Sequence, residues 1–356
     1  MIKVTVAIPV YNGEKYLTNC LESIIHQSLE KDEYEVIIVD DFSNDGTREM
    51  ITSYQEQYPQ LIKTIFRKVN SGGASVPRNE AIAHAQGEYI YFVDADDYLA
   101  EETLDRMYNY GRINNSDVII GKYVGLNDRK VPKAIFKDGN ISNAEIIENS
   151  LFYAVSALKM FKMNKIKELN LIFLKEATIA EDQVFTVAML CNTERISVLA
   201  EYDCYFISKH DGQHLSDTEL NPQLYFLLMS KIINTIYEGS VGDLEYKHRL
   251  AGKYITRIFR HGQFKNFYKK GVGTQEEKEE WLSLFSSFLN LHVPKEADQY
   301  VTPIFEDRIK YIRENDLYKI IIAEKLISVV NEMKSLKKEN QALKKEIQLI
   351  KNKGSH

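Results

Sequence analysis

Four short apolar runs alternate with three amphipathic segments over the first hundred residues, and this alternation constrains the fold more than any other feature of the sequence. The apolar runs have the length and composition of buried strands and cover residues 4–10, 34–39, 62–66 and 89–93. The segments between them repeat apolar residues at helical spacing over 14–28, 48–58 and 76–86. Strands and helices in this order favour an α/β fold, a mostly parallel sheet with helices on both faces.

Polar residues follow three of these strands at the point where each strand ends. They are Tyr11 and Asn12 after the first strand, Asp40 and Asp41 after the second, and the segment 94–97 after the fourth. Ligands of parallel α/β sheets bind beyond the carboxyl ends of the strands, so we expect these side chains to line one site. Turn formation and helix capping are the alternative interpretation of the acidic residues.

The segment 94–97 holds three carboxylates, those of Asp94, Asp96 and Asp97. Carboxylates this close together repel one another unless a cation or several hydrogen-bond donors offset their charge. Hard oxygen ligands suit Mg²⁺ or Mn²⁺ rather than zinc. We therefore predict that a divalent cation binds here and carries a nucleotide diphosphate.

A glycine-rich loop and a helix start lie between the two acidic clusters of this half of the chain. Gly72 and Gly73 let the backbone approach a ligand closely, and Pro77 suits the first turn of a helix. Arg78 would then point from the start of that helix toward the strand ends, where a diphosphate would bind.

A further acidic pair, Glu181 and Asp182, comes just before a helical pattern of apolar residues. A helix N-terminus stabilises an ionised carboxylate, which is the form that a general base needs. We predict that Asp182 is the base that deprotonates an acceptor hydroxyl, with Glu181 as the alternative base. Simple N-capping is the alternative interpretation of the pair.

A cluster of basic residues recurs at helical spacing in the carboxyl-terminal half. Its members share one helix face and are Arg249, Lys253, Arg257 and Arg260, which His261 and Lys265 extend. Apolar residues lie to the side or opposite and can be buried: Leu250, Tyr254, Ile255 and Ile258. Because no acid is interleaved, the pattern predicts a groove for an anionic polymer; a solvated charged face is the alternative.

The last 30 residues or so carry a heptad pattern. One core position holds Leu326, Met333, Asn340 and Ile347, and the other holds Val329, Leu336, Leu343 and Ile350. About four heptads of this kind predict a coiled coil and therefore self-association. A single long surface helix is the alternative, and it would leave the apolar stripe in water.

Length and composition set the remaining limits. With 356 residues the chain can form more than one domain, and we expect a catalytic domain over 1–220, a helical acceptor-binding and oligomerisation region over 221–325, and a coiled-coil helix over 326–353. A net charge of −6 argues against bulk binding of nucleic acid. The three cysteines follow no metal-binding spacing, and we expect buried thiols in a reducing compartment at Cys20, Cys191 and Cys204.

The sequence also bears on location. No apolar run approaches the roughly 20 residues that span a bilayer, and we see no signal peptide before the first strand. We therefore predict a soluble cytoplasmic protein without a transmembrane segment, which can act peripherally at the inner face of the membrane.

In their order, these motifs resemble those of the family-2 glycosyltransferases of the GT-A fold. The resemblance rests on five segments, 8–12, 39–47, 70–72, 77–79 and 92–97. Further segments resemble one branch of that family, the poly(ribitol-phosphate) wall teichoic acid β-N-acetylglucosaminyltransferases of Gram-positive bacteria, and in particular the shorter, phage-borne type. They include 73–79, 108–111, 114–123, 131–136, 180–186, 251–254 and 260–263, so the resemblance covers roughly residues 1–327.

The resemblance implies an inverting, metal-dependent transfer of N-acetylglucosamine from UDP-N-acetylglucosamine to a ribitol hydroxyl of the polymer, with Mn²⁺ or Mg²⁺ as cofactor. It places Asp41 at the uracil edge between Pro9 and Tyr11. It places the nucleotide sugar and metal against the segment Asp94, Ala95 and Asp96, with Asp94 at the ribose or metal and Asp96 as the metal ligand. Arg78 and the loop at Asn70 would contact the diphosphate or sugar.

The resemblance also implies contacts outside this centre. His214 would approach the diphosphate or metal when a loop closes, although a surface histidine is the alternative, and Tyr153 would face the acceptor. The resembling enzymes assemble as trimers, and we favour a trimer over the dimer that Asn340 at a core position would suit. Two alternatives stay open: a family-2 transferase that uses another UDP-sugar for a capsule or other anionic glycan, and a non-catalytic oligomeric protein that binds polyanions.

Overall fold

The computed structural model describes residues 1–175, 180–209, 221–260 and 273–353. The chain forms two compact units, Met1–Leu250 and Ala251–His356, and the division falls within helix α8 (Leu244–Arg260). The division into 1–220, 221–325 and 326–353 stays a prediction.

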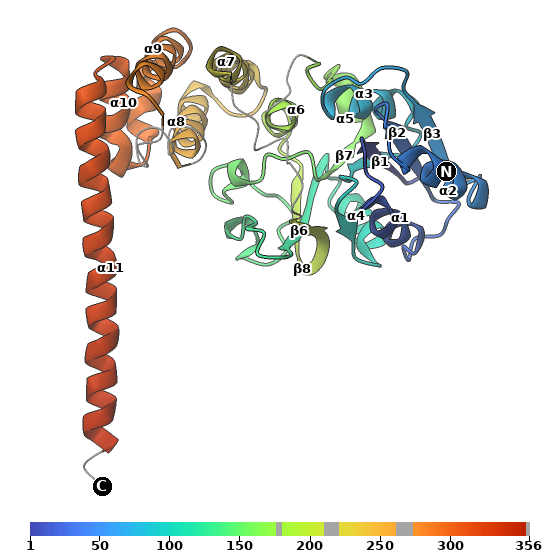
Figure 1. Ribbon diagram of the computed structural model, residues 1–356, viewed down its shortest axis with the longest axis horizontal. Coiled ribbons are helices and arrows are strands. Elements are labelled where there is room, and N and C mark those ends of the chain that lie inside the picture. The colour runs from blue at the N-terminus through green and yellow to red at the C-terminus, as the bar shows by residue number, and fades with distance from the viewer. Residues whose placement is uncertain (176–179, 210–220, 261–272, 354–356) are drawn as a thin grey trace. The chain divides into compact units, whose positions relative to one another are not determined.

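The first unit is built on one eight-stranded sheet (Figure 1). In chain order its strands are β1 (Val4–Val10), β2 (Tyr34–Asp40), β3 (Ile62–Phe66), β4 (Tyr89–Phe92), β5 (Tyr98–Leu99), β6 (Val118–Gly125), β7 (Met160–Lys162) and β8 (Ile196–Ile207). Their order across the sheet is β3-β2-β1-β4-β7-β6-β8-β5. The four apolar runs of the amino-terminal half all form strands, at nearly the bounds that the sequence predicts.

Strand β1 lies at the centre of the parallel half of the sheet. It pairs in parallel with both β2 and β4, and β2 pairs in parallel with β3. Strand β7 then pairs antiparallel with β4 and β6, so it interrupts the parallel order before β6 and β8 resume it. Residues of β2 and β4 are buried along their whole length, as continuous apolar runs require.

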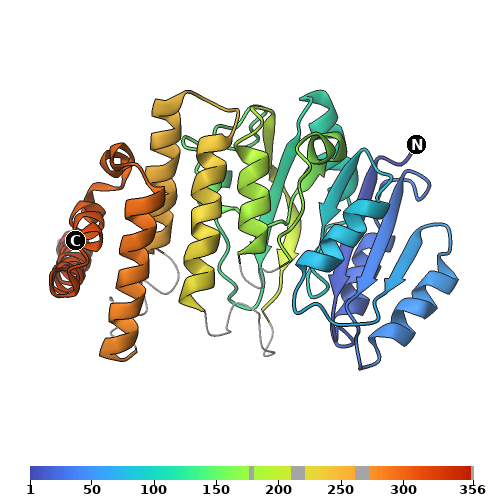
Figure 2. The same cartoon turned by 90° about the horizontal axis from the view of Figure 1, so that it is seen from above.

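Helices cover both faces of the parallel half, which confirms the α/β prediction. Helices α1 (Leu17–Ile25) and α4 (Thr103–Ile113) lie on one side of the sheet, and α3 (Ser75–His84) lies on the other (Figures 1 and 2). Helix α2 (Thr47–Gln57) packs along β3. Helices α5 (Met163–Glu168), α6 (Glu181–Leu190) and α7 (Pro222–Glu238) follow, and α6 packs against α7.

Four phenylalanines join α6 to the sheet. Phe185 of α6 stacks on Phe173 with ring centroids 4.2 Å apart, and Phe173 meets Phe92 of β4 edge-on at 5.2 Å. Phe161 of β7 completes the cluster at 5.4 Å from Phe185. All four side chains are buried, so apolar packing fixes the start of α6 relative to the end of β4.

The second unit is helical. It contains the end of α8, α9 (Gln275–His292), α10 (Glu306–Arg313) and α11 (Leu317–Lys353). Thr274 and Glu277 form a reciprocal capping box at the start of α9. A buried ion pair between Arg308 and Glu324 joins α10 to α11.

Helix α11 contains the heptad pattern within one continuous helix of 37 residues. Its apolar residues are exposed in the single chain: Leu326 by 60%, Val329 by 53%, Met333 by 54%, Leu336 by 53% and Leu343 by 54%. Such a stripe is unfavourable in water unless another surface covers it.

Two composition-based predictions concern thiols and membranes. Cys20, Cys191 and Cys204 are free and buried, and burial raises the pKa of each thiol. In the described part of the chain no helix is both long and apolar enough to cross a bilayer. The cytoplasmic location stays a prediction.

Candidate active site

The candidate site lies at the carboxyl ends of β1, β2 and β4, beside the first turns of α3 and α6. Arg78 of α3 links two of the acidic segments found in the sequence. Its guanidinium donates to Asp94 at 2.9 Å and to Glu181 at 3.2 Å, and the latter lies 103 residues further along the chain. The structure therefore brings the acidic segment after β4 and the acidic pair of α6 into one cluster.

Arg78 is buried, with 5% of its surface exposed, and its guanidinium lies 5.3 Å from the ring of Phe173. Burial alone would lower its pKa, but the charges of Asp94, Glu181 and Asp182 outweigh burial and raise the pKa above its ordinary value. The arginine therefore stays a cation among carboxylates. Its direction toward the strand ends agrees with the expectation from the sequence.

The carboxylates after β4 are closely coupled. Burial raises the pKa of Asp94, Arg78 opposes that effect, and Asp96 adds to it. Burial and the charges of Asp94 and Asp96 raise the pKa of Asp97 to about 8. Asp97 also accepts a hydrogen bond from the Ser208 backbone N–H at 2.8 Å, which anchors this segment to the end of β8.

The donor set limits how a metal could be bound. Within the described ranges, no group of three or more histidine, cysteine or acidic side chains is arranged to hold a metal ion. Asp94 and Asp96 can offer carboxylate oxygens, and their mutual repulsion favours an added cation. This fits Mg²⁺ or Mn²⁺, since Mg²⁺ sites commonly use one or two carboxylates and take their other ligands from phosphate and water.

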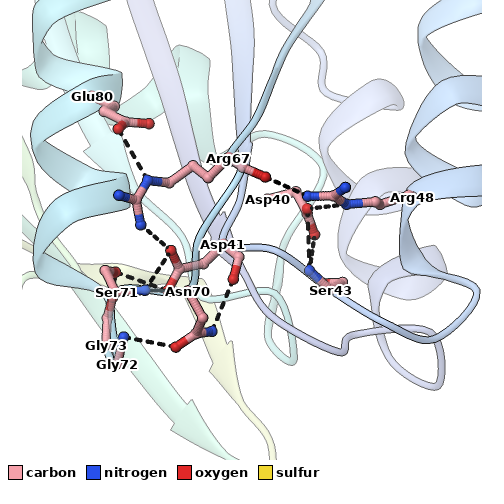
Figure 3. A network of polar contacts seen from close by, with 10 residues as sticks. All are labelled: Asp40, Asp41, Ser43, Arg48, Arg67, Asn70, Ser71, Gly72, Gly73 and Glu80. Carbon is pink, nitrogen blue, oxygen red and sulfur yellow. Dashed lines mark hydrogen bonds and ion pairs between the residues drawn. The ribbon is translucent and has the colours of Figure 1, made fainter.

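Asp41 is held by the glycine-rich loop (Figure 3). Its carboxylate oxygens accept from the Ser71 backbone N–H at 3.0 and 3.1 Å and from the Ser71 hydroxyl at 2.8 Å. Arg67 forms an ion pair with Asp41 and donates to Glu80 at 3.0 Å. The Asn70 side chain donates to the Asp41 carbonyl oxygen at 2.8 Å, so the loop and the end of β2 form one hydrogen-bonded unit.

Asp40, the neighbour of Asp41, has a different environment. Its carboxylate pairs with Arg48 at 2.6 Å and accepts from the Ser43 backbone N–H at 3.2 Å (Figure 3). Both contacts stabilise the turn that leads to α2. The turn-forming alternative therefore holds for Asp40, whereas Asp41 contacts the glycine-rich loop.

The loops after β1 and β2 contain exposed aromatic side chains. Tyr11 is 52% exposed and Phe42 is 46% exposed. Asn12 and Phe42 both have positive φ, 51° and 69°, and such residues concentrate at functional sites. A hydrogen bond of 2.9 Å from the Asn12 N–H to the Ser43 hydroxyl joins the two loops. Pro9 is half-buried next to the end of β1, and Ala95 lies close to Gly13 in the loop after β1.

Asp182 occupies the first turn of α6 with Glu181. The N-cap residue is Ala180, which has φ 55° and no side-chain cap bond, so neither acid occupies the N-cap position. Glu181 is engaged by Arg78. Asp182 is half-buried and lies within the electrostatic reach of Arg78.

Arg67 and Ser71 are site residues that the sequence reasoning did not assign. Arg67 directly follows β3, at the one predicted strand end without an expected site residue, so its position was the available signal. Two expected residues, His214 and His261, lie outside the described residues, as does Lys265. Tyr153 is half-buried at the end of a short 3₁₀ helix, Leu151–Tyr153.

The predicted basic face lies on α8. Lys253 and Arg260 are exposed and Arg257 is half-buried, whereas the apolar residues expected to be buried, Leu250, Tyr254, Ile255 and Ile258, are buried. Arg249 pairs with Glu148 at 3.3 Å. An acid from another part of the chain therefore compensates this one cation, which the helix sequence alone does not indicate.

Two segments of the chain match known protein families. Residues 5–169 match glycosyl transferase family 2, and residues 222–324 match the glycosyl transferase TarS linker domain. The first segment contains β1–β4 and the carboxylates after β4, and the second begins at α7 and ends within α11.

The chain is similar to curated proteins over most of its length. It is 42% identical to the poly(ribitol-phosphate) β-N-acetylglucosaminyltransferase TarP of Staphylococcus aureus, over 92% of this chain and 100% of TarP. It is 40% identical to a poly(ribitol-phosphate) β-glucosyltransferase of Bacillus spizizenii, over 89% of this chain. It spans 49% of that protein and 54% of the related S. aureus enzyme TarS, to which it is 32% identical.

Solved structures agree with these sequence matches. Residues 1–349 of S. aureus TarS in complex with UDP-GlcNAc match with a TM-score of 0.86 and 30% identity, over 91% of each chain. The same part of TarS in complex with UDP matches with a TM-score of 0.82. The GT-A sheet with its helices, followed by a helical carboxyl-terminal region, is therefore common to both proteins.

The Arg78 cluster yields a stability prediction. Replacing Arg78 with methionine should lower the free energy of unfolding by roughly 2–3 kcal/mol, because Asp94 and Glu181 lose a charged hydrogen-bond donor where solvent is restricted. The matched control is Arg112→Met, since Arg112 is 56% exposed on α4 and pairs with Glu88 at 3.0 Å. Its loss should cost much less, because exposed ion pairs contribute little to stability. Equal losses in urea unfolding followed by circular dichroism would contradict this view of the cluster.

Proposed function

The chain belongs to glycosyl transferase family 2, and from that premise we propose that it transfers N-acetylglucosamine from UDP-N-acetylglucosamine to a ribitol hydroxyl of poly(ribitol-phosphate) wall teichoic acid. The observation that carries this proposal is the 42% identity to TarP over the full length of TarP. The joining of the two acidic segments through Arg78 supports a working catalytic centre.

For the donor, we propose that the uracil binds at Asp41 between Pro9 and Tyr11. The exposed ring of Tyr11 supports this role, because an aromatic face at a strand end can stack on a base. The loop that holds Asp41 also brings Asn70 to the same edge. Asn70 and Arg78 would then contact the diphosphate or the sugar.

We further propose that Asp94 and Asp96 hold Mn²⁺ or Mg²⁺, with Ala95 in contact with the nucleotide sugar. When bound, the ion would neutralise charge that develops on the leaving diphosphate. Arg78 contributes a fixed cation at the same place. His214 remains a candidate contact to the diphosphate.

The reaction that this arrangement suits is a single in-line displacement with inversion. Asp182 accepts the proton of the ribitol hydroxyl, whose oxygen forms a bond to the anomeric carbon as the bond to the UDP oxygen breaks. The contact of Glu181 with Arg78 favours Asp182 as the base, because Glu181 is already committed to an ion pair. Arg78 offsets negative charge on the departing diphosphate.

The proposal is tested by UDP release from the purified protein with Mn²⁺, across several UDP-sugars. Release that depends on poly(ribitol phosphate), and that is absent with poly(glycerol phosphate), is expected from UDP-N-acetylglucosamine alone. The 40% identity to a β-glucosyltransferase makes UDP-glucose the second candidate donor. Release from UDP-glucose only would retain the mechanism and change the transferred sugar, whereas no release with any pair would reject the function.

If Asp182 is the base, its replacement should lower turnover and leave donor binding nearly unchanged. Asp182→Asn should lower kcat by a factor of about 10²–10⁴, because the hydroxyl loses its proton acceptor. The affinity for UDP-N-acetylglucosamine, measured by calorimetry, should change by less than about twofold. Full turnover in Asp182→Asn, together with its loss in Glu181→Gln, would transfer the role to Glu181.

For the acceptor, we propose that Lys253, Arg257, Arg260 and His261 bind polymer phosphates and that Tyr153 faces the acceptor. Aromatic rings support two of these cations, since Arg257 lies 5.7 Å from the Tyr254 ring and Arg260 lies 6.0 Å from the Phe305 ring. Such packing restricts the side chains before a ligand arrives. The retained Asp94, Asp96 and Asp182 argue against the alternative of a non-catalytic polyanion-binding protein.

The polymer site predicts a change in salt dependence. Arg257→Ala combined with Arg260→Ala should weaken polymer binding at least tenfold and flatten its dependence on salt, because two phosphate contacts are lost. Lys295→Ala is the control, since Lys295 is an exposed cation in the same unit. Polymer affinity that is the same in both variants would reject the site.

We propose that the exposed stripe of α11 forms a coiled coil between copies of the chain, with a trimer favoured over a dimer. Several active sites on one assembly would hold a repeating polymer by avidity.

The coiled coil predicts that Leu336→Lys yields a monomer in light scattering, because a charge enters an apolar core position. Lys337→Glu, which changes a neighbouring position outside the stripe, should keep the wild-type mass. A wild-type mass of two chains would replace the trimer with a dimer, and a mass of one chain would reject the coiled coil.

A further inference from the structure

The first unit contains a completely buried lysine side chain. Lysine is rarely fully buried in proteins. Lys159 lies just before β7 and has 0% of its surface exposed. Its Nζ donates to the Ser156 carbonyl oxygen at 2.6 Å and to the Tyr123 hydroxyl at 3.3 Å. Neither acceptor carries a negative charge, so these bonds satisfy donors without neutralising the ammonium.

A shared carbonyl group connects this lysine to α6. The Ser156 oxygen that accepts from Lys159 also accepts from the Thr186 hydroxyl at 3.1 Å. Thr186 is four residues after Asp182 on α6, and residues at this spacing lie on the same helix face. Lys159 therefore lies next to the face of α6 on which Asp182 and Thr186 are found.

The electrostatic environment of Lys159 also indicates an interaction with Asp182. Burial lowers its pKa from 10.5 to about 7, and among the described residues Asp182 is the charged group that acts in the opposite direction. Tyr123, which faces Lys159 from β6, stays neutral because burial raises its pKa. Asp182 therefore interacts electrostatically with Lys159 and with Arg78 of α3, and Glu181 precedes it in the chain.

Arg78 and Lys159, which both interact with Asp182, differ in their other charged partners. Arg78 interacts with Asp94 and Glu181 as well as Asp182, and the proposed diphosphate would engage it further. An incoming diphosphate and an anionic polymer both favour protonation of a nearby carboxylate. Among the described residues, Lys159 is a cation whose charged partner is Asp182 alone, so it can offset this effect.

Building on the proposed function, we propose that Lys159 is a positioning residue that keeps Asp182 in its carboxylate form while the anionic substrates are bound. The coupling is reciprocal: if Asp182 favours the protonated lysine, the protonated lysine favours the ionised Asp182 to the same extent. An apolar side chain of similar length would fill the space without the cost of burying a charge. A purely structural role therefore does not account for a lysine here.

The experiment compares wild type with Lys159→Met and Lys159→Arg. In Lys159→Met the acid limb of the kcat/KM profile should move to higher pH by about one unit, whereas the arginine variant should keep it near its wild-type position. The affinity for UDP-N-acetylglucosamine should stay within about twofold in both. An acid limb at the same pH in wild type and Lys159→Met would overturn the proposal.

A second readout does not depend on turnover. Carbon-13 NMR of labelled aspartates, with Asp182→Asn used to assign the Asp182 signal, should give a higher titration midpoint for Asp182 in Lys159→Met than in wild type. If the wild type does not transfer sugar, the proposed function fails, but this midpoint still decides the role of Lys159. Equal midpoints reject it in either case.

Stability supplies the check on folding. Because the lysine pKa is lower in the folded state, the unfolded chain binds more protons between pH 7 and 10.5, and wild-type stability should rise with pH over that window. Lys159→Met should thus gain more stability relative to wild type at pH 7 than at pH 10. Should Lys159→Met not fold, Lys159→Gln takes its place in both readouts, and an acid limb and an Asp182 midpoint equal to those of wild type would overturn the proposal.

Discussion

The buried guanidinium of Arg78 joins two acidic segments that would otherwise repel each other. Asp94 follows the fourth strand of the sheet, whereas Glu181 begins a helix 103 residues after Arg78. The phenylalanine cluster of Phe92, Phe173 and Phe185 brings these elements together by apolar packing, and Arg78 makes the approach of their charges tolerable. The position of Asp182 beside the strand ends follows from both, because Asp182 is the next residue of the same helical turn. The proposed nucleotide-binding and acceptor-activating groups are thus parts of one electrostatic unit.

The amino-terminal half was predictable because three of its four strands are buried on both faces. Strands β1, β2 and β4 are largely apolar, and acidic residues lie at the end of β2 and just after β4. The sheet beyond β4 was not predicted. Strand β7 has only three residues, which is too short to show a hydrophobic period. Strand β6 pairs with β8 across register shifts near Lys122, and a sequence pattern does not indicate such shifts. The spacing of apolar residues along the sequence does not predict a strand order that depends on such pairings.

In the site, too, local sequence patterns predicted some residues, whereas contacts between distant parts of the chain were not predicted. Asp41, Arg78, Asp94 and Asp96 follow from strand ends and one glycine-rich loop, and a resemblance to known transferases adds their expected roles. The partners that define their environment could not be predicted. Arg67 reaches Asp41 from another strand, and Lys159 has no motif at all, because a single lysine in a sequence is normally a surface residue. Neighbours can also differ: Asp40 stabilises a turn, while Asp41 binds the loop.

The hydrogen bonds of Asp41 limit which base could bind at the proposed uracil position. A carboxylate offers about four acceptor positions, and the Ser71 amide, the Ser71 hydroxyl and Arg67 already use most of them. Roughly one position is left for a ligand. A base that presents one N–H at this edge, as uracil does, is fully satisfied there, whereas a base that needs two acceptors must displace a loop residue. In the proposed site, discrimination between nucleotides would therefore follow from the small number of free lone pairs on Asp41, and the glycine-rich loop sets that number before any donor binds.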